Sequence, residues 1–337
     1  MNVLLKSGKL LDENGLLISS GFAFELVREY RKSDVVLQTR LKEINRYNII
    51  SNDFALSITV SSSANSSYVS LCFNDFNNNK SYVKTKIKIL GYGNIVMPPD
   101  SRIGSIEYVK KDFSIEVYNN FRERKISFAL KDLIKGKDFY CYANLKETTN
   151  GTSVVAIPFE KSDEFIYNQK ITCLAVDGYV NIGDDKYEFN KDTRANIDWI
   201  RGVFPQKEIK YNYACLSSVQ DGKEIGFTLV DKLGNNKYAT SNMFFYDTQA
   251  YKLNEVKITP TARLRKNNKD WEIKSIDSQV DLIFSPSEHI VENIKNMFEY
   301  SNRNIIYGTY SGFLMFDKEK IEIKNLFGFI EVNNLKY

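Results

Sequence analysis

Residues 196–205, "NIDWIRGVFP", place an acid, a tryptophan and an arginine within four positions. Alternate side chains of a β-strand point to opposite faces, so Trp199 and Arg201 would share one face, stacked as a cation–π pair, with Asp198 on the other. We prefer the structural interpretation, in which Trp199 closes one end of the second β-barrel and Arg201 lies across it or pairs with Asp198. In the functional alternative, Asp198 faces a cavity as a general acid or base, and incomplete pairing in a buried position raises its pKa.

A second group of polar residues lies around the aromatic run "MFFYD". Thr240 and Asn242 precede this run, and Tyr251 and Lys252 follow it after a turn, so the two pairs can meet across a hairpin. An ammonium beside a phenol lowers the phenol's pKa, which suits proton donation or oxyanion binding. Tyr251 and Lys252 are therefore candidate catalytic residues, and Thr240 and Asn242 are candidate ligand contacts.

A third polar group, Tyr167, Asn168 and Lys170, lies in "FIYNQKI". These side chains could contact a ligand. They could also satisfy the backbone groups of a buried crossover between two domains, as amide side chains do. We favour the structural interpretation and keep the three residues as candidate ligand contacts.

The sequence lacks the residue patterns that several other kinds of site would require. His289 is the only histidine, it follows Ser-Pro-Ser-Glu in an expected surface loop, and no GxSxG segment supplies a nucleophile for it. The four cysteines, Cys72, Cys141, Cys173 and Cys215, form no CxxC pair and are expected to be buried thiols of a reducing compartment. No glycine-rich phosphate loop precedes a helix. We therefore expect neither a metal nor a cofactor.

The charges narrow the choice of partners. The net charge of +4 comes from 46 basic and 42 acidic residues that alternate along the chain, whereas nucleic-acid binders concentrate positive charge in patches or tails. The first apolar run ends at Lys6, too early for the core of a signal peptide, and no later run is long enough to cross a membrane. We expect a soluble, cytoplasmic protein that binds no nucleic acid and has no membrane span.

Hydrophobic periodicity of two dominates the 337 residues, as in "FALSITV", "DFSIEVY" and "KEIGFTLV". This pattern predicts an all-β protein with many short antiparallel strands, closed into barrels or packed as sandwiches to protect the strand edges. Residues 24–35 and 289–300 could form short helices. The polar stretch before residue 165 predicts two domains, residues 1–165 and 166–337.

The order of short motifs from about residue 10 to the C-terminus resembles a bacterial domain-of-unknown-function family, DUF2804. The motifs are "YNQKI", "DGYVNI", "IDWIRGVFP", "GFTLV", "ATSNMFFYD", "YKL", "VDLIFSP" and "GFIEV". That family is distantly similar to lipocalin-like proteins that include carotenoid 1,2-hydratases. The resemblance implies two consecutive lipocalin-like β-barrels with a cavity for a lipophilic or amphipathic small molecule. It also supports barrel closure by Trp–Arg packing.

The chain departs from these relatives where acid–base groups would be expected. The hydratases read Asp-His-x-Trp-Gly where this chain has Trp199 and Arg201 at the His and Trp positions. Members of the family have glutamate at the position of Ser241, histidine at Tyr251, and a histidine-bearing stretch in place of the one that ends at Tyr307. These departures lower the expectation of the relatives' chemistry.

Three functions remain open. The preferred one is binding of an apolar or amphipathic small molecule in an aromatic-lined cavity. The alternative is a cofactor-independent hydratase, isomerase or cyclase that uses Asp198 with Tyr251 or Lys252. A structural or protein-interaction scaffold would instead show no ligand-sized cavity and an exposed apolar patch.

Overall fold

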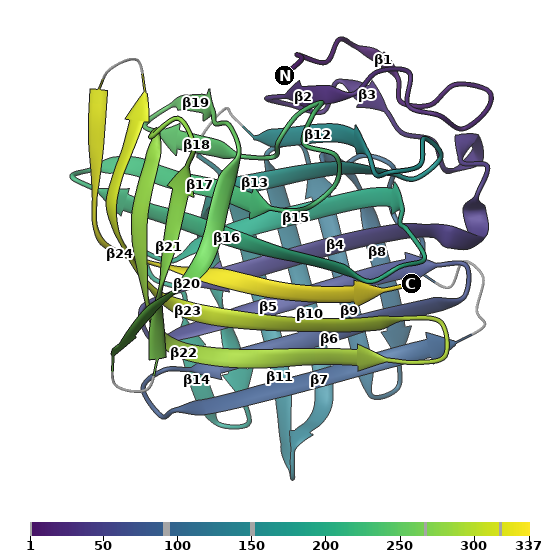
Figure 1. Ribbon diagram of the computed structural model, residues 1–337. Helices are drawn as coiled ribbons and strands as arrows, with labels where there is room; N and C mark the ends of the chain where they lie inside the picture. Colours follow the sequence, from purple (N-terminus) through teal and green to yellow (C-terminus); the bar gives the residue numbers. More distant parts are fainter. Residues whose placement is uncertain (1, 90–94, 149–151, 266–267, 317–318) are drawn as a thin grey trace.

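The computed structural model describes residues 2–89, 95–148, 152–265, 268–316 and 319–337. The chain is all-β, and its described strands pair antiparallel except for β1 with β3; two curled sheets form two lipocalin-like half-barrels (Figure 1). Two 3-10 turns, η1 (Lys32–Asp34) and η2 (Gln38–Arg40), are the only helical elements among the described residues. No helix in these ranges is long and apolar enough to cross a membrane.

Thirteen strands of the described chain form the first sheet, with the path β7-β6-β5-β4-β15-β13-β11-β10-β9-β8. β12 and β14 pair with β13, and β2 pairs with β12. The bounds are β2 Gly21–Ala23, β4 Leu41–Ile50, β5 Phe54–Ser63, β6 Ser66–Asp75, β7 Lys80–Ile89, β8 Ile103–Lys110, β9 Phe113–Asn120, β10 Glu123–Ile134, β11 Lys137–Glu147, β12 Ser153–Pro158, β13 Phe165–Ile182, β14 Asp185–Glu188 and β15 Arg194–Val203.

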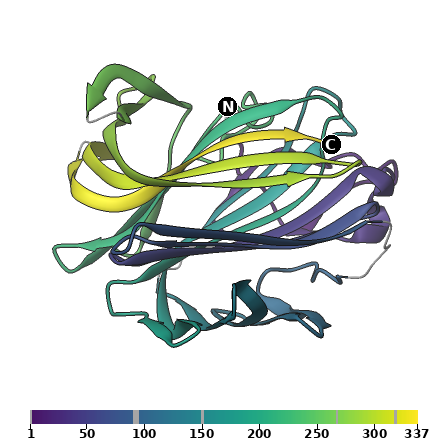
Figure 2. The ribbon, with the colours of Figure 1, turned by 90° about the horizontal axis from the view of Figure 1, so that it is seen from below.

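Nine strands of the described chain form the second sheet, in the order β19-β18-β17-β16-β24-β23-β22-β21-β20. The bounds are β16 Ile209–Gln220, β17 Lys223–Asp231, β18 Met243–Tyr246, β19 Gln249–Lys252, β20 Val256–Arg265, β21 Asn268–Ser275, β22 Val280–Lys295, β23 Tyr300–Phe316 and β24 Glu319–Lys336. The long strands β22, β23 and β24 extend beyond the curl of their own sheet and lie over β4, β5 and β6, while β8 to β11 form a further layer below (Figure 2).

Apolar side chains fill four spaces in this arrangement. One core lies inside the first sheet, around Phe54 and Phe128, and another inside the second sheet, around Phe227. A third core lies between the two sheets. The fourth includes Trp199 and lies between the first sheet and the N-terminal segment, residues 2–40, which contains the parallel pair β1 (Gly8–Lys9) and β3 (Arg28–Glu29). The two faces of the central strands therefore contact different partners.

Two expectations from the sequence differ from the structure. Residues 289–300 form no helix, because β22 runs to Lys295 with Ile290, Glu292 and Ile294 buried in a period of two. Residues 24–35 hold only β3 and the 3-10 turn η1.

The change of sheet falls at a different place from the predicted domain boundary at residue 165, and the division into two domains stays a prediction. β13 and β15, which that division assigns to the C-terminal domain, pair with strands of the first sheet. The second sheet begins at Ile209. The long strand β13 explains the difference, because it pairs with β12 and β15 near its start and with β11 and β14 farther along.

Candidate functional site

Strand β15 divides its side chains between two environments. Trp199 is fully buried on the face that packs against the N-terminal segment, and the Arg201 guanidinium carbon lies 4.2 Å from the centroid of its ring. Tyr30 and Tyr167 pack edge-on against the same tryptophan. The predicted Trp–Arg stack is therefore present, inside the apolar core beneath the N-terminal segment.

Arg201 is held by protein groups alone. Its Nη1 donates to the carbonyls of Ile44 and Ile200 and to Oδ1 of Asn45, at 2.7–3.3 Å, and Nη2 donates to the Pro98 carbonyl at 2.8 Å. Burial lowers the pKa of Arg201, although the nearby Glu43 carboxylate opposes this shift. With both terminal nitrogens engaged, Arg201 positions the strand and its neighbours. A direct role for it as a ligand contact stays a prediction.

A cavity opens beside this stack, between the N-terminal segment and the loop before β8. Its volume is about 600 Å³. The walls include apolar side chains of Leu26, Val27 and Met97, and the polar lining includes Tyr30, Glu43 and Tyr167; the remaining lining residues are Arg28, Glu29, Arg31, Lys32, Ser33, Pro99, Asp100 and Arg102. Of the predicted ligand contacts, Tyr167 lines this cavity.

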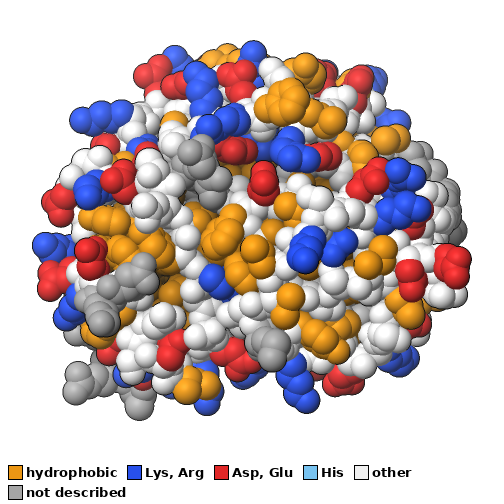
Figure 3. Space-filling model, turned by 90° about the horizontal axis from the view of Figure 1, so that it is seen from above, with side chains coloured by type: hydrophobic (Ala, Val, Ile, Leu, Met, Phe, Trp, Pro, Cys, Tyr) orange, Lys and Arg blue, Asp and Glu red, His pale blue; other side chains and the backbone are white. Residues whose placement is uncertain are grey.

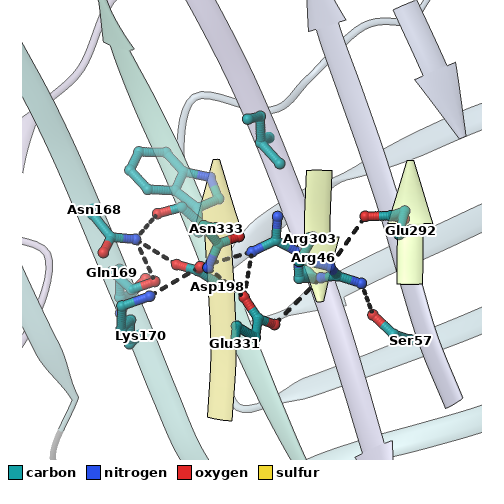
Figure 4. A network of polar contacts seen from close by, with 12 residues as sticks. Arg46, Ser57, Asn168, Gln169, Lys170, Asp198, Glu292, Arg303, Glu331 and Asn333 are labelled. Atoms are coloured by element: carbon teal, nitrogen blue, oxygen red, sulfur yellow. Dashed lines mark hydrogen bonds and ion pairs between the residues drawn. The ribbon is translucent and has the colours of Figure 1, made fainter. Parts of the chain in front are cut away.

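Asp198 points the opposite way, into the space between the sheets (Figure 4). Lys170 Nζ lies 2.9 Å from its carboxylate, Arg46 Nη1 lies 3.4 Å away, and Asn168 Nδ2 donates to it at 2.6 Å. Asp198, Lys170 and Asn168, which the sequence analysis placed in two separate polar groups, are therefore in contact. Asp198 lines neither this cavity nor the cavity of about 560 Å³ beside Phe159 and Ile209.

The electrostatics of Asp198 correct the premise of the acid–base hypothesis. Burial by itself raises the pKa of this carboxyl, but the charges of Lys170 and Arg46 outweigh burial, and the pKa is lowered. The hypothesis required a raised pKa. Asp198 is a fixed anion between two cations, which makes it a weak general acid or base.

The ionic contacts of Asp198 continue into the second sheet. Arg46 of β4 lies 3.6 Å from Glu331 of β24, and Arg303 of β23 lies 3.4 Å from Glu331 and 3.0 Å from Glu292 of β22. Arg303 also donates to the Ser57 hydroxyl of β5 at 2.8 Å. We call Arg46, Lys170, Asp198, Glu292, Arg303 and Glu331 the inter-sheet network. Its three cations balance three carboxylates, so it joins the sheets without net charge.

The sequence analysis did not identify Arg46, Glu292, Arg303 or Glu331. One signal was available in "FGFIEVNN", where the alternation places Glu331 on the same strand face as Phe329. A lone carboxylate on an otherwise apolar face indicates a buried partner. The identity of that partner was not readable, because Arg46 is far away in the sequence.

Lys252 forms the third group of predicted residues. Its Nζ donates to Thr240 Oγ1 at 2.5 Å and to the carbonyls of Leu253 and Asn242 at 2.6 and 3.1 Å. Tyr251 lies on the other side of β19, where its ring packs against Phe316 with centroids 4.1 Å apart. Lys252, Thr240 and Asn242 are thus brought together, whereas Tyr251 packs against Phe316, and a catalytic role for Tyr251 and Lys252 stays a prediction.

Burial lowers the pKa of Lys252 to about 7. A lysine with a lowered folded-state pKa binds its proton more weakly in the folded than in the unfolded chain, so stability rises with pH between about 7 and 10. We expect the free energy of unfolding of the wild type, relative to Lys252→Met, to rise by about 2 kcal/mol from pH 7 to pH 9. Urea unfolding at both pH values measures this change. Lys274→Met, at an exposed lysine, should show no such rise, and a flat difference for Lys252→Met would contradict the expectation.

The remaining candidates are simple to place. His289 is exposed, as expected, but it lies in strand β22 and not in a loop. All four cysteines are buried and free, as expected. Among the described residues, no cluster of three or more His, Cys, Asp or Glu side chains is arranged to hold a metal ion.

The fold and these buried contacts define a two-sheet, lipocalin-like β-protein. The chain belongs to the family described as Domain of unknown function (DUF2804), whose family model matches residues 2–337. No curated protein matches it in sequence.

Among solved structures, the chain is similar to CghA with Sch210972, with a TM-score of 0.52, 9% identity, and coverage of 88% of this chain and 89% of CghA. Kievitone hydratase from Nectria haematococca gives a TM-score of 0.49 and 10% identity, covering 86% and 88%. A putative AttH from Nitrosomonas europaea gives 0.49 and 11%, covering 87% and 92%. At 9% identity, the similarity to CghA shows a shared fold and nothing more.

Proposed function

We propose that this protein binds an apolar or amphipathic small molecule in the cavity beside the Trp199–Arg201 stack. The observation that carries the proposal is the cavity itself, whose volume of about 600 Å³ lies within the range of about 300–1,000 Å³ typical of ligand pockets. Its lining combines four apolar residues and two tyrosines with seven charged residues, which suits an amphipathic ligand better than a purely apolar one.

The cavity is also preorganised. The Tyr167 hydroxyl donates to the Arg28 carbonyl at 2.9 Å and accepts from the Arg28 backbone N–H at 3.3 Å, which fastens the N-terminal segment to β13. Trp199 supports the rings of Tyr30 and Tyr167 from behind. Side chains that are fixed before binding lose little entropy when a ligand arrives. CghA, which shares the fold, has been solved with Sch210972, and this supports a small-molecule role for the fold.

The catalytic alternative, hydration, isomerisation or cyclisation through Asp198, has less support. Its carboxylate is paired with Lys170 and Arg46 and lies on the opposite face of β15 from the cavity. The scaffold alternative is supported by exposed apolar side chains of the N-terminal segment, such as Leu4 and Val36. Figure 3 shows the molecule from above, with apolar patches separated by interspersed positive and negative side chains.

A blocking substitution tests the binding proposal. Ser33 is exposed and lines the cavity, so Ser33→Trp should fill part of it and weaken binding of the neutral fluorophore N-phenyl-1-naphthylamine by about tenfold or more. Fluorescence titration measures the affinity, and a thermal scan checks that the variant is folded. The matched control is Ser162→Trp at an exposed turn outside the cavity. If wild type does not bind the fluorophore, or if both variants bind it equally, the cavity is not the site.

A further inference from the structure

Glu43 is a buried carboxylate on the wall of the proposed ligand cavity. Its exposed fraction is 2%, and β4 directs it toward the N-terminal segment. It accepts a hydrogen bond from the Tyr30 hydroxyl at 3.0 Å and from Lys32 Nζ at 2.9 Å. A buried carboxylate is costly unless cations or hydrogen bonds compensate its charge. The cation that pairs with Glu43 therefore decides which ligands the cavity can bind.

Arg201 supplies only part of this compensation. Its Nε lies 3.5 Å from Glu43, while its terminal nitrogens donate to backbone carbonyls and Asn45. Lys32, at 2.9 Å, is the closer cation. The carboxylate thus depends on a second positive group on the cavity side.

Lys32 is a replaceable partner. Its side chain is 45% exposed, and Lys32 is the first residue of the short turn η1. An ion pair made by a half-exposed lysine contributes little net stability, because solvent screens it and the long side chain loses entropy. A cation brought by a ligand could take its place without leaving Glu43 unpaired.

The other charges around the cavity are largely compensated. Arg31 pairs with Glu29 at 2.7 Å and Arg102 pairs with Asp100 at 2.6 Å. Arg28 donates to the Lys9 carbonyl and the Ser19 hydroxyl in the N-terminal segment. Arg31 and Arg102 are therefore paired with carboxylates and Arg28 donates to neutral groups, whereas the wall offers a carboxylate whose cation can be exchanged.

Aromatic side chains also line the cavity wall that carries the Glu43 carboxylate. Tyr30 and Tyr167 line the same cavity as Glu43. A cation near the faces of aromatic rings is stabilised by their quadrupoles, more so where water is excluded. We infer that the ligand, if the proposed binding function holds, is an amphipathic amine whose cationic group displaces Lys32 from Glu43 while its apolar part lies against Leu26 and Met97.

Three amphiphiles of equal chain length separate the head-group charge from the apolar contribution. Decylammonium, decanol and decanoate compete at pH 7 with bound N-phenyl-1-naphthylamine, below the concentrations at which they form micelles. Decylammonium should bind the wild type about tenfold more tightly than either of the others. Equal or tighter binding of decanoate would overturn the inference. The proposed function fails separately, if the neutral fluorophore and all three amphiphiles leave the cavity empty.

Lys32→Met is the decisive variant, because it removes the lysine that competes with the ligand amine for Glu43. The ordinary loss of an ion pair would not strengthen binding of an amine. Decylammonium affinity should rise about fivefold, while decanol affinity stays the same. Lys137→Met, in the exposed Lys137–Asp185 pair, is the matched control and should change neither. Unchanged or weaker decylammonium binding to Lys32→Met would refute the exchange. Glu43→Gln should abolish the preference for the amine where that variant folds, and the Lys32→Met result decides the question if it does not.

Discussion

Replacing Asp198 with asparagine is expected to lower the free energy of unfolding by about 3–5 kcal/mol, although the two side chains have nearly the same shape. Asp198 is buried, with Lys170 at 2.9 Å and Arg46 at 3.4 Å. The neutral amide would leave these two cations buried with one counter-charge fewer. Removing one partner of a buried ion pair costs more than the pair contributes, because desolvation of the remaining charge is no longer offset.

Urea unfolding at pH 7 measures this loss. Asp185→Asn breaks an exposed pair at 3.0 Å and should cost less than about 1 kcal/mol. The double variant Asp198→Asn with Lys170→Met should lose less than the sum of its single variants, because it removes an anion together with a cation. A loss below about 1 kcal/mol for Asp198→Asn would show that the carboxylate has no structural role.

The pH dependence follows from the same contacts. The pKa of Asp198 is lowered in the folded chain, so its stabilisation is present above the unfolded pKa of about 4 and is lost as the pH falls toward the lower folded pKa. The difference between wild type and Asp198→Asn should therefore be constant near neutral pH and shrink below about pH 4.

The features that could be predicted from the sequence are those that depend on the alternation of side chains along a single strand. A period of two placed Trp199 and Arg201 on one face of a strand and Asp198 on the other, and the structure confirms this division. The same pattern predicted the all-β class, since it requires only neighbours two residues apart. The aromatic and β-branched composition supported it because such residues pack well on a pleated surface.

What the sequence could not show are contacts between strands that are remote in the chain. Arg46 and Glu331 meet because β24 crosses over the first sheet, and nothing in either segment specifies that crossing. The helix expected at residues 289–300 failed for a related reason. Its apolar residues fit both periods, and the length of β22, set by pairing with β23, decided for the strand.

Strand β15 connects the two candidate regions through its opposite faces. One face carries Trp199 and Arg201, which support the cavity that contains Glu43 and Tyr30. The other carries Asp198 in the inter-sheet network. The network joins the sheets with balanced charges, whereas the cavity wall holds the buried carboxylate of Glu43, which pairs with the half-exposed Lys32. Ligand recognition is therefore expected on the N-terminal side of the sheet.

Trp199→Ala is expected to lower the free energy of unfolding by about 3–5 kcal/mol, because removing this large, fully buried side chain would leave a cavity. The loss includes the stack with Arg201 and the edge-on contacts with Tyr30 and Tyr167. Two of the cavity-lining rings would lose their support, so affinity for N-phenyl-1-naphthylamine should fall as well. Trp199→Phe keeps an aromatic ring and should lose less of both.

Trp271, the second tryptophan, is a matched control because it is only partly buried and lies in the second sheet. Trp271→Ala should lose less stability than Trp199→Ala and should keep the fluorophore affinity of the wild type. Urea unfolding and fluorescence titration together separate the two roles of Trp199. If Trp199→Ala keeps full affinity while losing stability, the tryptophan holds the N-terminal segment in place without shaping the cavity. If both alanine variants weaken binding equally, the effect reflects general loosening of the fold and the cavity is not specifically supported by Trp199.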